Sequence, residues 1–226
     1  MQFNNDLERK LLFVILFGAL ALAGSRINYS QVIGAPNQTF TLFQFFGPIA
    51  GGFLGAGLGV AAVLLSELSS NVLQGKAFDL LNIARFLPML FAAVYFSRSH
   101  IKFSAIIPAA CILLFWLNPV GAQVWYFPLL FWLIPIAATF LPDRLLLKSL
   151  GSTLTAHAIG SVIWLWTVPM TVAQWQTVIP LAIVERSSFA LGIAASYLVV
   201  NYVLDKFTAS AKAGFPHVDK RYVISA

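Results

Sequence analysis

Long apolar stretches, separated by short polar segments, run along almost the whole chain. Two of them contain no Asp, Glu, Lys or Arg: forty residues from Phe103 to Pro142 and thirty-six from Ser149 to Val184. Because about 20 apolar residues in a helix cross the hydrocarbon core of a bilayer, each stretch is long enough for two crossings joined by a turn. The pattern therefore predicts helical hairpins in a membrane.

Read along the whole chain, the same pattern predicts seven apolar segments, of which the third and fourth are short. They cover residues 11–25, 42–65, 80–96, 103–117, 125–141, 150–168 and 178–204. Of the intervening segments, only residues 28–41 are long enough for a structured loop. We expect an all-α fold, a polytopic transmembrane bundle of six to seven helices that forms one domain at 1–205, followed by a short polar cytoplasmic tail at 206–226.

The composition agrees with a membrane protein. Hydrophobic residues make up 59% of the 226 residues and charged residues only 10%, whereas soluble domains carry about 25% charged residues. The net charge of +6 does not indicate a nucleic-acid partner, because the basic residues are scattered between helices and in the tail rather than gathered in one stripe. We expect membrane lipid around the bundle and no nucleic acid.

Basic residues orient the predicted bundle. Arg98 with Lys102, Arg144 with Lys148, and the Lys and Arg residues of the tail are separated by hairpins without charge at their tips. The positive-inside rule places these clusters, and with them the C-terminus, in the cytoplasm. Basic residues near the N-terminus favour the same side, which an odd number of spans contradicts. The choice between six and seven spans therefore stays open.

The first apolar segment has an alternative interpretation. A basic pair, an apolar run and small residues before Gly24 have the form of a cleavable signal peptide. We favour a retained helix, because the rest of the chain is itself polytopic and the spacing of small residues in this segment suits helix packing.

Small residues recur with a four-residue period in two segments. Gly47, Gly51, Gly55 and Gly59 in the second segment would make one helix face nearly bare backbone, which another helix can approach closely. We favour packing inside the bundle over a mobile contact surface. On the first helix, Ala19 and Ala23 form a smaller face of this kind. There, packing and docking of a partner are equally open.

Ionisable residues inside apolar segments are candidates for a binding site, because they are costly in a membrane. Glu185 and Arg186 follow the start of their segment at residue 178 by seven and eight residues, which places them about 10 Å deep. Trp164 on the preceding helix shares this depth, and His157 lies two turns deeper as the floor of a polar cavity. A buried ion pair with only an architectural role remains the alternative.

Aromatic residues at segment ends allow two interpretations. Trp125 and Trp164 are expected at the same membrane face as residues 28–41, where their rings would hold a planar ligand. An interfacial aromatic belt is the default alternative.

Several chemistries have no motif in the sequence. The three histidines are too far apart for a zinc-binding HExxH motif, and neither a Walker-type GxxxxGK[ST] nor a GxSxG element occurs. We therefore predict no metal site, no cofactor and no catalytic residues, and a protein that is not an enzyme.

Residues 46–52, with their Gly-Pro-x-x-Gly pattern, the small-residue helix after them and residues 75–96 resemble the second and third helices of energy-coupling-factor (ECF) transporter substrate-binding S components. Residues 179–204 resemble the last helix of these proteins. The resemblance covers under half of the chain. The family usually has six helices, whereas seven are predicted here, so the region 103–141 departs from its pattern.

The resemblance implies a function as well as a fold. S components capture a vitamin or a related micronutrient at the outer face of the prokaryotic plasma membrane. They associate with a transmembrane coupling subunit and two ATPase subunits. In the family an Ala-x-x-x-Ala face on the first helix contacts the coupling subunit, and Ala19 and Ala23 match that face residue by residue.

We therefore expect a membrane-embedded substrate-binding subunit for micronutrient uptake, with a pocket capped by residues 28–41. Its expected ligand contacts are Trp125, Trp164 and Glu185, with His157 below them. The alternative is a non-transporting membrane scaffold that binds partner proteins through its glycine face and basic loops. A channel or an autonomous carrier is disfavoured, because the sequence shows no internal repeat with paired broken helices.

Overall fold

The computed structural model describes residues 6–34, 38–98, 102–208 and 216–223. The helices are α1 (Asp6–Gly24), α2 (Ile49–Leu73), α3 (Leu80–Ala84), α4 (Leu87–Arg98), α5 (Ile106–Trp116), α6 (Pro119–Gln123), α7 (Tyr126–Ala138), α8 (Leu145–Thr167) and α9 (Val172–Thr208). Two strands, β1 (Asn28–Gln31) and β2 (Thr39–Thr41), pair antiparallel. The described ranges also contain three short 3-10 helices: η1 (Leu42–Phe45), η2 (Lys102–Ala105) and η3 (Lys220–Tyr222). The predicted helical class is confirmed, and the expected loop at 28–41 contains the hairpin β1–β2.

Three helices are long and apolar enough to cross a membrane: Ile49–Leu73, Leu80–Ser97 and Val172–Lys206. Shorter apolar helices cover Phe13–Gly24, Ile106–Trp116 and Tyr126–Ala138. At 1.5 Å per residue, the 11 residues of α5 extend about 16 Å, roughly half of the hydrocarbon thickness. Helix length and apolarity therefore identify three candidate spans among the described residues.

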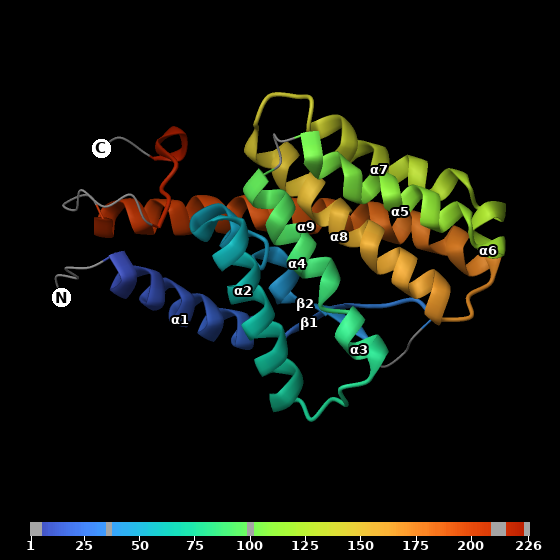
Figure 1. Ribbon diagram of the computed structural model, residues 1–226, viewed down its shortest axis with the longest axis horizontal. Helices are drawn as coiled ribbons and strands as arrows, with labels where there is room; N and C mark the ends of the chain where they lie inside the picture. Colours follow the sequence, from blue (N-terminus) through green and yellow to red (C-terminus); the bar gives the residue numbers. More distant parts are fainter. Residues whose placement is uncertain (1–5, 35–37, 99–101, 209–215, 224–226) are drawn as a thin grey trace.

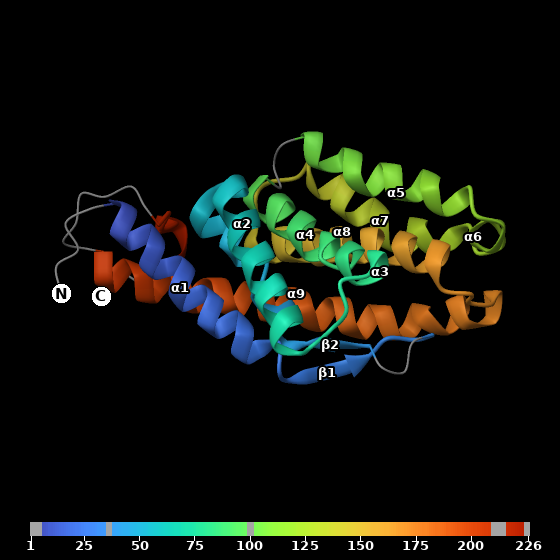
Figure 2. The same ribbon diagram turned by 60° about the horizontal axis from the view of Figure 1, so that its bottom comes forward.

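The longer helices follow the long axis of the molecule. In Figure 1, α5, α7, α8 and α9 run along this axis, with the described chain ends together at one end and α6 at the other. We call these the tail end and the α6 end. Figure 2 shows the hairpin β1–β2 beside the half of α9 that begins at the α6 end.

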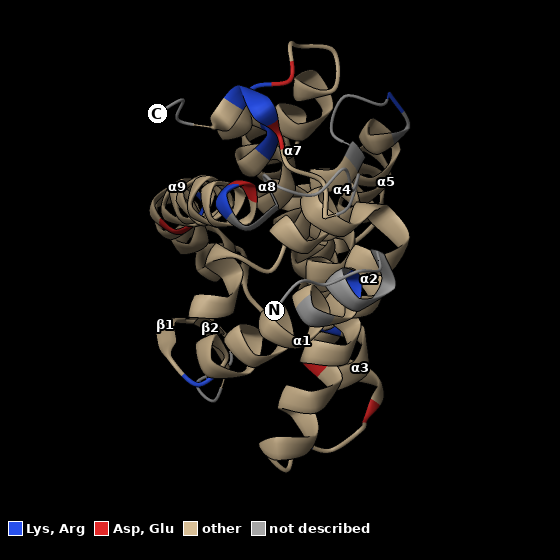
Figure 3. Cartoon of the chain, turned by 90° about the vertical axis from the view of Figure 1, so that its left-hand side faces the viewer, with Lys and Arg blue, Asp and Glu red and all other residues tan. Residues whose placement is uncertain are grey.

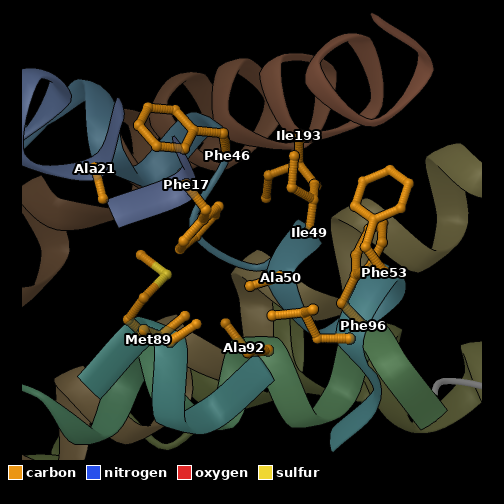
Figure 4. Packing of buried hydrophobic residues seen from close by; sticks show 14 of the residues in the cluster. Phe17, Ala21, Phe46, Ile49, Ala50, Phe53, Met89, Ala92, Phe96 and Ile193 are labelled. Atoms are coloured by element: carbon orange, nitrogen blue, oxygen red, sulfur yellow. The ribbon is translucent and has the colours of Figure 1, made fainter. Parts of the chain in front are cut away.

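Two apolar clusters form the core. The first joins α1, α2, α4 and α9, and Figure 4 shows Phe17, Ile49, Phe53 and Ile193 within it. The second joins α5, α7 and α8 with the start of α9, and in it the buried ring of Phe115 contacts three other aromatic rings. Such buried rings supply much of the apolar area that stabilises the fold. The space between the two clusters contains the cavity described below.

The predicted continuous glycine face on the second helix is wrong. Helix α2 kinks at Gly55, whose φ of 75° and ψ of 174° are not helical, and Gly47 precedes the helix. Glycine suits this kink because L side chains rarely tolerate positive φ. Gly51 and Gly59 pack against each other across the bend, since a Cβ at Gly59 would lie 2.6 Å from Gly51 Cα. These two glycines therefore serve packing within the bundle.

The described tail residues fold back onto the bundle. The backbone N–H of His217 donates to the carbonyl of Phe53 at 3.0 Å, and Asn201 of α9 exchanges two hydrogen bonds with the backbone of Asp219. Arg221 pairs with Asp143 at 3.1 Å and with Asp219 at 2.7 Å. The tail thus ties α9 to the turn between α7 and α8.

We expect Asp219→Ala to release this tail. The side-chain hydrogen bond from Arg221 lowers the pKa of the Asp219 carboxyl below its ordinary value. The ion pair therefore stabilises the fold at pH values above the pKa of Asp219 in the unfolded chain. This stabilisation is lost as the pH falls through the lower pKa of Asp219 in the folded protein. Because proteolysis tracks the open population, trypsin should cleave the variant severalfold faster at Lys220 and Arg221 at neutral pH. His217→Ala, which keeps its backbone donor, is the control, and equal rates in both variants would contradict the expectation.

Candidate binding site

A cavity of about 250 Å³ lies between the two apolar clusters. Its wall consists of the hairpin β1–β2, the 3-10 helix η1, the end of α2, the segment α3–α4, and the facing parts of α8 and α9. Segments from both halves of the sequence therefore meet there. The cavity is partly open, and a concave site with apolar walls and a few convergent polar groups is typical of small-molecule binding.

Glu185 and Arg186 form a buried ion pair on the wall contributed by α9. Arg186 Nη2 lies 3.1 Å from Glu185 Oε2, and Ser30 Oγ of β1 donates to Glu185 Oε1 at 2.5 Å. The Arg186 guanidinium lies over the rings of Phe40 and Phe189, at 4.5 and 4.8 Å from their centroids. Both carboxylate oxygens are thus engaged, and the pair fastens the hairpin to α9.

His157 and Trp164 of α8 also line the cavity. His157 is buried, and its Nδ1 accepts a hydrogen bond from Trp132 Nε1 at 3.4 Å. Trp164 Nε1 donates to the carbonyl of Ile33 at 3.0 Å, which links α8 to the segment that follows β1. The structure therefore brings together three of the four predicted site residues, His157, Trp164 and Glu185, each with polar atoms already bonded to the chain.

Trp125 lies elsewhere. It occupies the N-cap position of α7, is 57% exposed and packs its ring on Tyr126. It does not belong to the described residues that line the cavity. The prediction that it contacts a ligand in this cavity is therefore wrong. Similar depth along neighbouring helices does not determine which way a side chain faces, and the exposed position suits the alternative interpretation as an interfacial tryptophan.

Three residues of the cavity wall carry unpartnered donors whose atoms have almost no exposed surface. In the described part of the chain, four buried side-chain polar atoms have no hydrogen-bond partner: Asn71 Nδ2, Ser149 Oγ, Trp175 Nε1 and Arg186 Nε. Three of these belong to cavity-lining residues, and all three are N–H donors. A buried donor without an acceptor costs about 1–3 kcal/mol, and native proteins contain few of them. A bound molecule that offers acceptors would remove this cost.

Charged and polar side chains also line the wall at the end of α2 and at α3–α4. Glu67, Lys76 and Arg85 face the cavity there, and no two of them form an ion pair within 4 Å in the described ranges. Arg85 Nη1 lies 3.5 Å from Asn82 Oδ1, which is long for a hydrogen bond. Burial, followed by repulsion from Arg85, lowers the pKa of Lys76 below its ordinary value.

Three residues of the cavity wall were not predicted from the sequence: Asn71, Trp175 and Arg85. Asn71 follows the predicted second segment, Trp175 lies in a turn between two predicted segments, and Arg85 lies near the start of a span. Polar and aromatic residues are common at such ends for reasons unrelated to ligands. The signal that identifies these residues is their convergence in three dimensions, which their spacing does not reveal.

The arrangement offers binding chemistry. No group of three or more His, Cys, Asp and Glu side chains that could hold a metal ion occurs within the described residues. The cavity wall instead contains residues with N–H donors, several aromatic rings, and two cations, Lys76 and Arg85, that form no ion pair within 4 Å in the described ranges. These groups can position and desolvate a small polar molecule.

Comparison with known proteins identifies one relative and no family. No protein-family model and no solved structure matches the chain. An uncharacterized protein of Methanocaldococcus jannaschii is 26% identical to it over 200 residues, which cover 79% of this chain and 67% of that protein. The similarity spans most of the fold and carries no functional description.

Proposed function

We propose that this chain is the membrane-embedded substrate-binding subunit of a micronutrient uptake transporter of the ECF type. The observation that carries the proposal is a partly open cavity whose lining residues include three with buried N–H donors that lack acceptors: Asn71, Trp175 and Arg186. Residues with spare donors around such a cavity are suited to hold a molecule that offers acceptors.

In this proposal the chain crosses a prokaryotic plasma membrane six to seven times, with its C-terminus in the cytoplasm. The distribution of charge supports this orientation. Figure 3 views the molecule from its tail end and shows basic residues on the C-terminal segment and at the turn between α7 and α8. The hairpin that lines the cavity lies beside the half of α9 nearer the α6 end. With the proposed orientation, the cavity would face the outer side.

The outer face of α1 supports association with a coupling subunit and, through it, two ATPase subunits. Phe13, Phe17 and Ala21 pack into the bundle, whereas Ala19 and Ala23 are exposed on α1. Small exposed residues at this spacing allow the close approach of another helix. Both alanines are thus accessible to lipid or to a partner.

The alternative of a membrane scaffold has less support. Its main feature was a glycine surface for partner proteins, but Gly51 lies against the backbone of Ala93 in α4, and Gly59 lies against Gly51. A surface occupied inside the bundle does not bind a second protein.

The decisive test is a thermal-shift screen of the detergent-purified protein with vitamins, nucleobases, amino acids and metal ions. We expect one class of small molecule to stabilise the protein saturably, by about 2.7 kcal/mol at a hundredfold excess over the dissociation constant. A flat response to the whole panel, with other membrane proteins co-purifying, would favour the scaffold.

Trp175→Phe sharpens this test. The substitution keeps an aromatic ring but removes the unpartnered Nε1 donor. Affinity for the molecule found in the screen should fall about tenfold, because one hydrogen bond is lost. Thermal stability without ligand should change little, because the void left by the smaller ring in the second apolar cluster offsets the removal of an unsatisfied donor. Trp166→Phe, at an exposed tryptophan outside the cavity, is the matched control. Equal affinities in the two variants would contradict the site.

A further inference from the structure

The cations and the unpartnered buried atoms of the cavity lining are donors. The three unpartnered buried atoms are N–H groups, and Lys76 and Arg85 add side chains that can only donate. The Glu185 carboxylate already accepts from Ser30 and from Arg186. Among the lining carboxylates this leaves Glu67 with unused acceptor capacity. A complementary ligand therefore presents mainly acceptors.

The charges of the lining side chains are also unbalanced. Lys76, Arg85 and Arg186 carry three positive charges and Glu67 and Glu185 two negative charges, so the sum is 3 − 2 = +1. Arg186 and Glu185 neutralise each other as an ion pair. The remaining excess lies at Lys76, which is exposed, and at Arg85, which is half-buried, on the wall formed by the end of α2 and the segment α3–α4. A ligand with one negative group would supply a nearby counter-charge to both side chains.

The apolar part of the wall is rich in polarisable groups. Beside aliphatic side chains it contains these rings and thioethers: Phe40, Phe86, Met89, Trp164, Met170 and Trp175. Aromatic faces and methionine sulfur favour contact with a planar ring. The volume of about 250 Å³ lies just below the range of about 300–1,000 Å³ for drug-sized ligands, so one or two rings fit.

We infer that the cavity binds a small planar organic anion, an aromatic or heteroaromatic carboxylate of one or two rings. This inference rests on the proposed function and names the class of its substrate. The ring system packs among the aromatic side chains, and the carboxylate lies toward Arg85 and Lys76. Asn71, Trp175 and Arg186 line the same cavity, and a turn of these side chains would bring their unpartnered N–H groups to acceptors on the ring or its substituents.

The experiment compares probes that differ only in charge. Pyridine-3-carboxylate, benzoate and indole-3-carboxylate are titrated into the detergent-purified protein at pH 7, each beside its neutral amide and its aminomethyl cation. The carboxylates should bind at least tenfold more tightly than the amides, and the cations more weakly still. The inference is overturned if the strongest ligand, in this series or in the broad screen, is neutral or cationic. A response to no compound of any charge overturns the proposed function as well.

Arg85→Gln tests the position of the carboxylate. We expect it to weaken binding of the tightest carboxylate probe at least tenfold and to change binding of the matched amide less than threefold. Arg85→Lys keeps the charge and should keep most of the affinity. Arg26→Gln is the control, because Arg26 is exposed, donates to the carbonyl of Leu73 and is not part of the described cavity lining. Equal loss for carboxylate and amide would show a structural role for Arg85 and overturn this assignment.

Discussion

Glu185→Ala should lower the free energy of unfolding by about 3–5 kcal/mol, because it leaves the Arg186 guanidinium charged and without its carboxylate in a buried site. It also removes the acceptor of Ser30, which joins the hairpin to α9. Thermal or denaturant unfolding of the unliganded protein in detergent measures the loss. Hydrogen exchange at residues 28–31 should rise in the same variant.

Two further variants separate the ion pair from simple loss of a side chain. Replacing both partners, Glu185→Met with Arg186→Met, should destabilise the protein less than Glu185→Ala alone, since no charge is left unpaired. Glu67→Ala removes a carboxylate from the same cavity without breaking an ion pair. It should lower the free energy of unfolding less than Glu185→Ala does. If Glu185→Ala lowered the free energy of unfolding no more than the double replacement does, the unpaired Arg186 charge would not be the source of the loss.

Gly51→Ala should destabilise the fold by about 3 kcal/mol, at the upper end for overpacking. A Cβ at Gly51 would lie 2.8 Å from the carbonyl carbon of Ala93, and backbone atoms of α4 cannot move aside as a flexible side chain can. The same measurement of unfolding in detergent tests this expectation.

Gly57→Ala is the matched control for the glycine prediction. Gly57 lies in the same helix, and a Cβ there meets no atom within 4 Å. Alanine should therefore stabilise the helix by roughly 0.5–1 kcal/mol, because it restricts the unfolded chain. A change of the same sign in the free energy of unfolding of both variants would contradict the packing of Gly51 against α4.

The positions of the helices could be predicted well from the sequence. Each of the seven apolar segments contains a described helix, because a long uncharged run has few other ways to satisfy its backbone. The kink in α2 could not be predicted, since a four-residue glycine period is compatible with a straight helix and does not reveal the positive φ of Gly55. The pairing of β1 with β2 was also missed, because strands of four and three residues are too short for a periodic signal.

The site was predicted in part, for a physical reason. His157 and Glu185 were identified because a polar group in an apolar segment needs a partner, and the structure gives each of them one. Depth alone did not show which helix face carries Trp125. Asn71 and Trp175 lie where polar and aromatic residues need no special explanation, so only their shared cavity distinguishes them.

Helix α9 connects two distant parts of the molecule mechanically. Glu185, which fastens the hairpin, and Asn201, which holds the tail, lie sixteen residues apart in this one helix, or about 24 Å, and its internal proline, Pro180, lies outside that interval. A helix of this length resists compression, so a push or rotation applied where the tail is bound moves the wall of the cavity with it. In the proposed function, this stiffness would couple contact with a partner subunit at one end of α9 to the position of the cavity wall at the other.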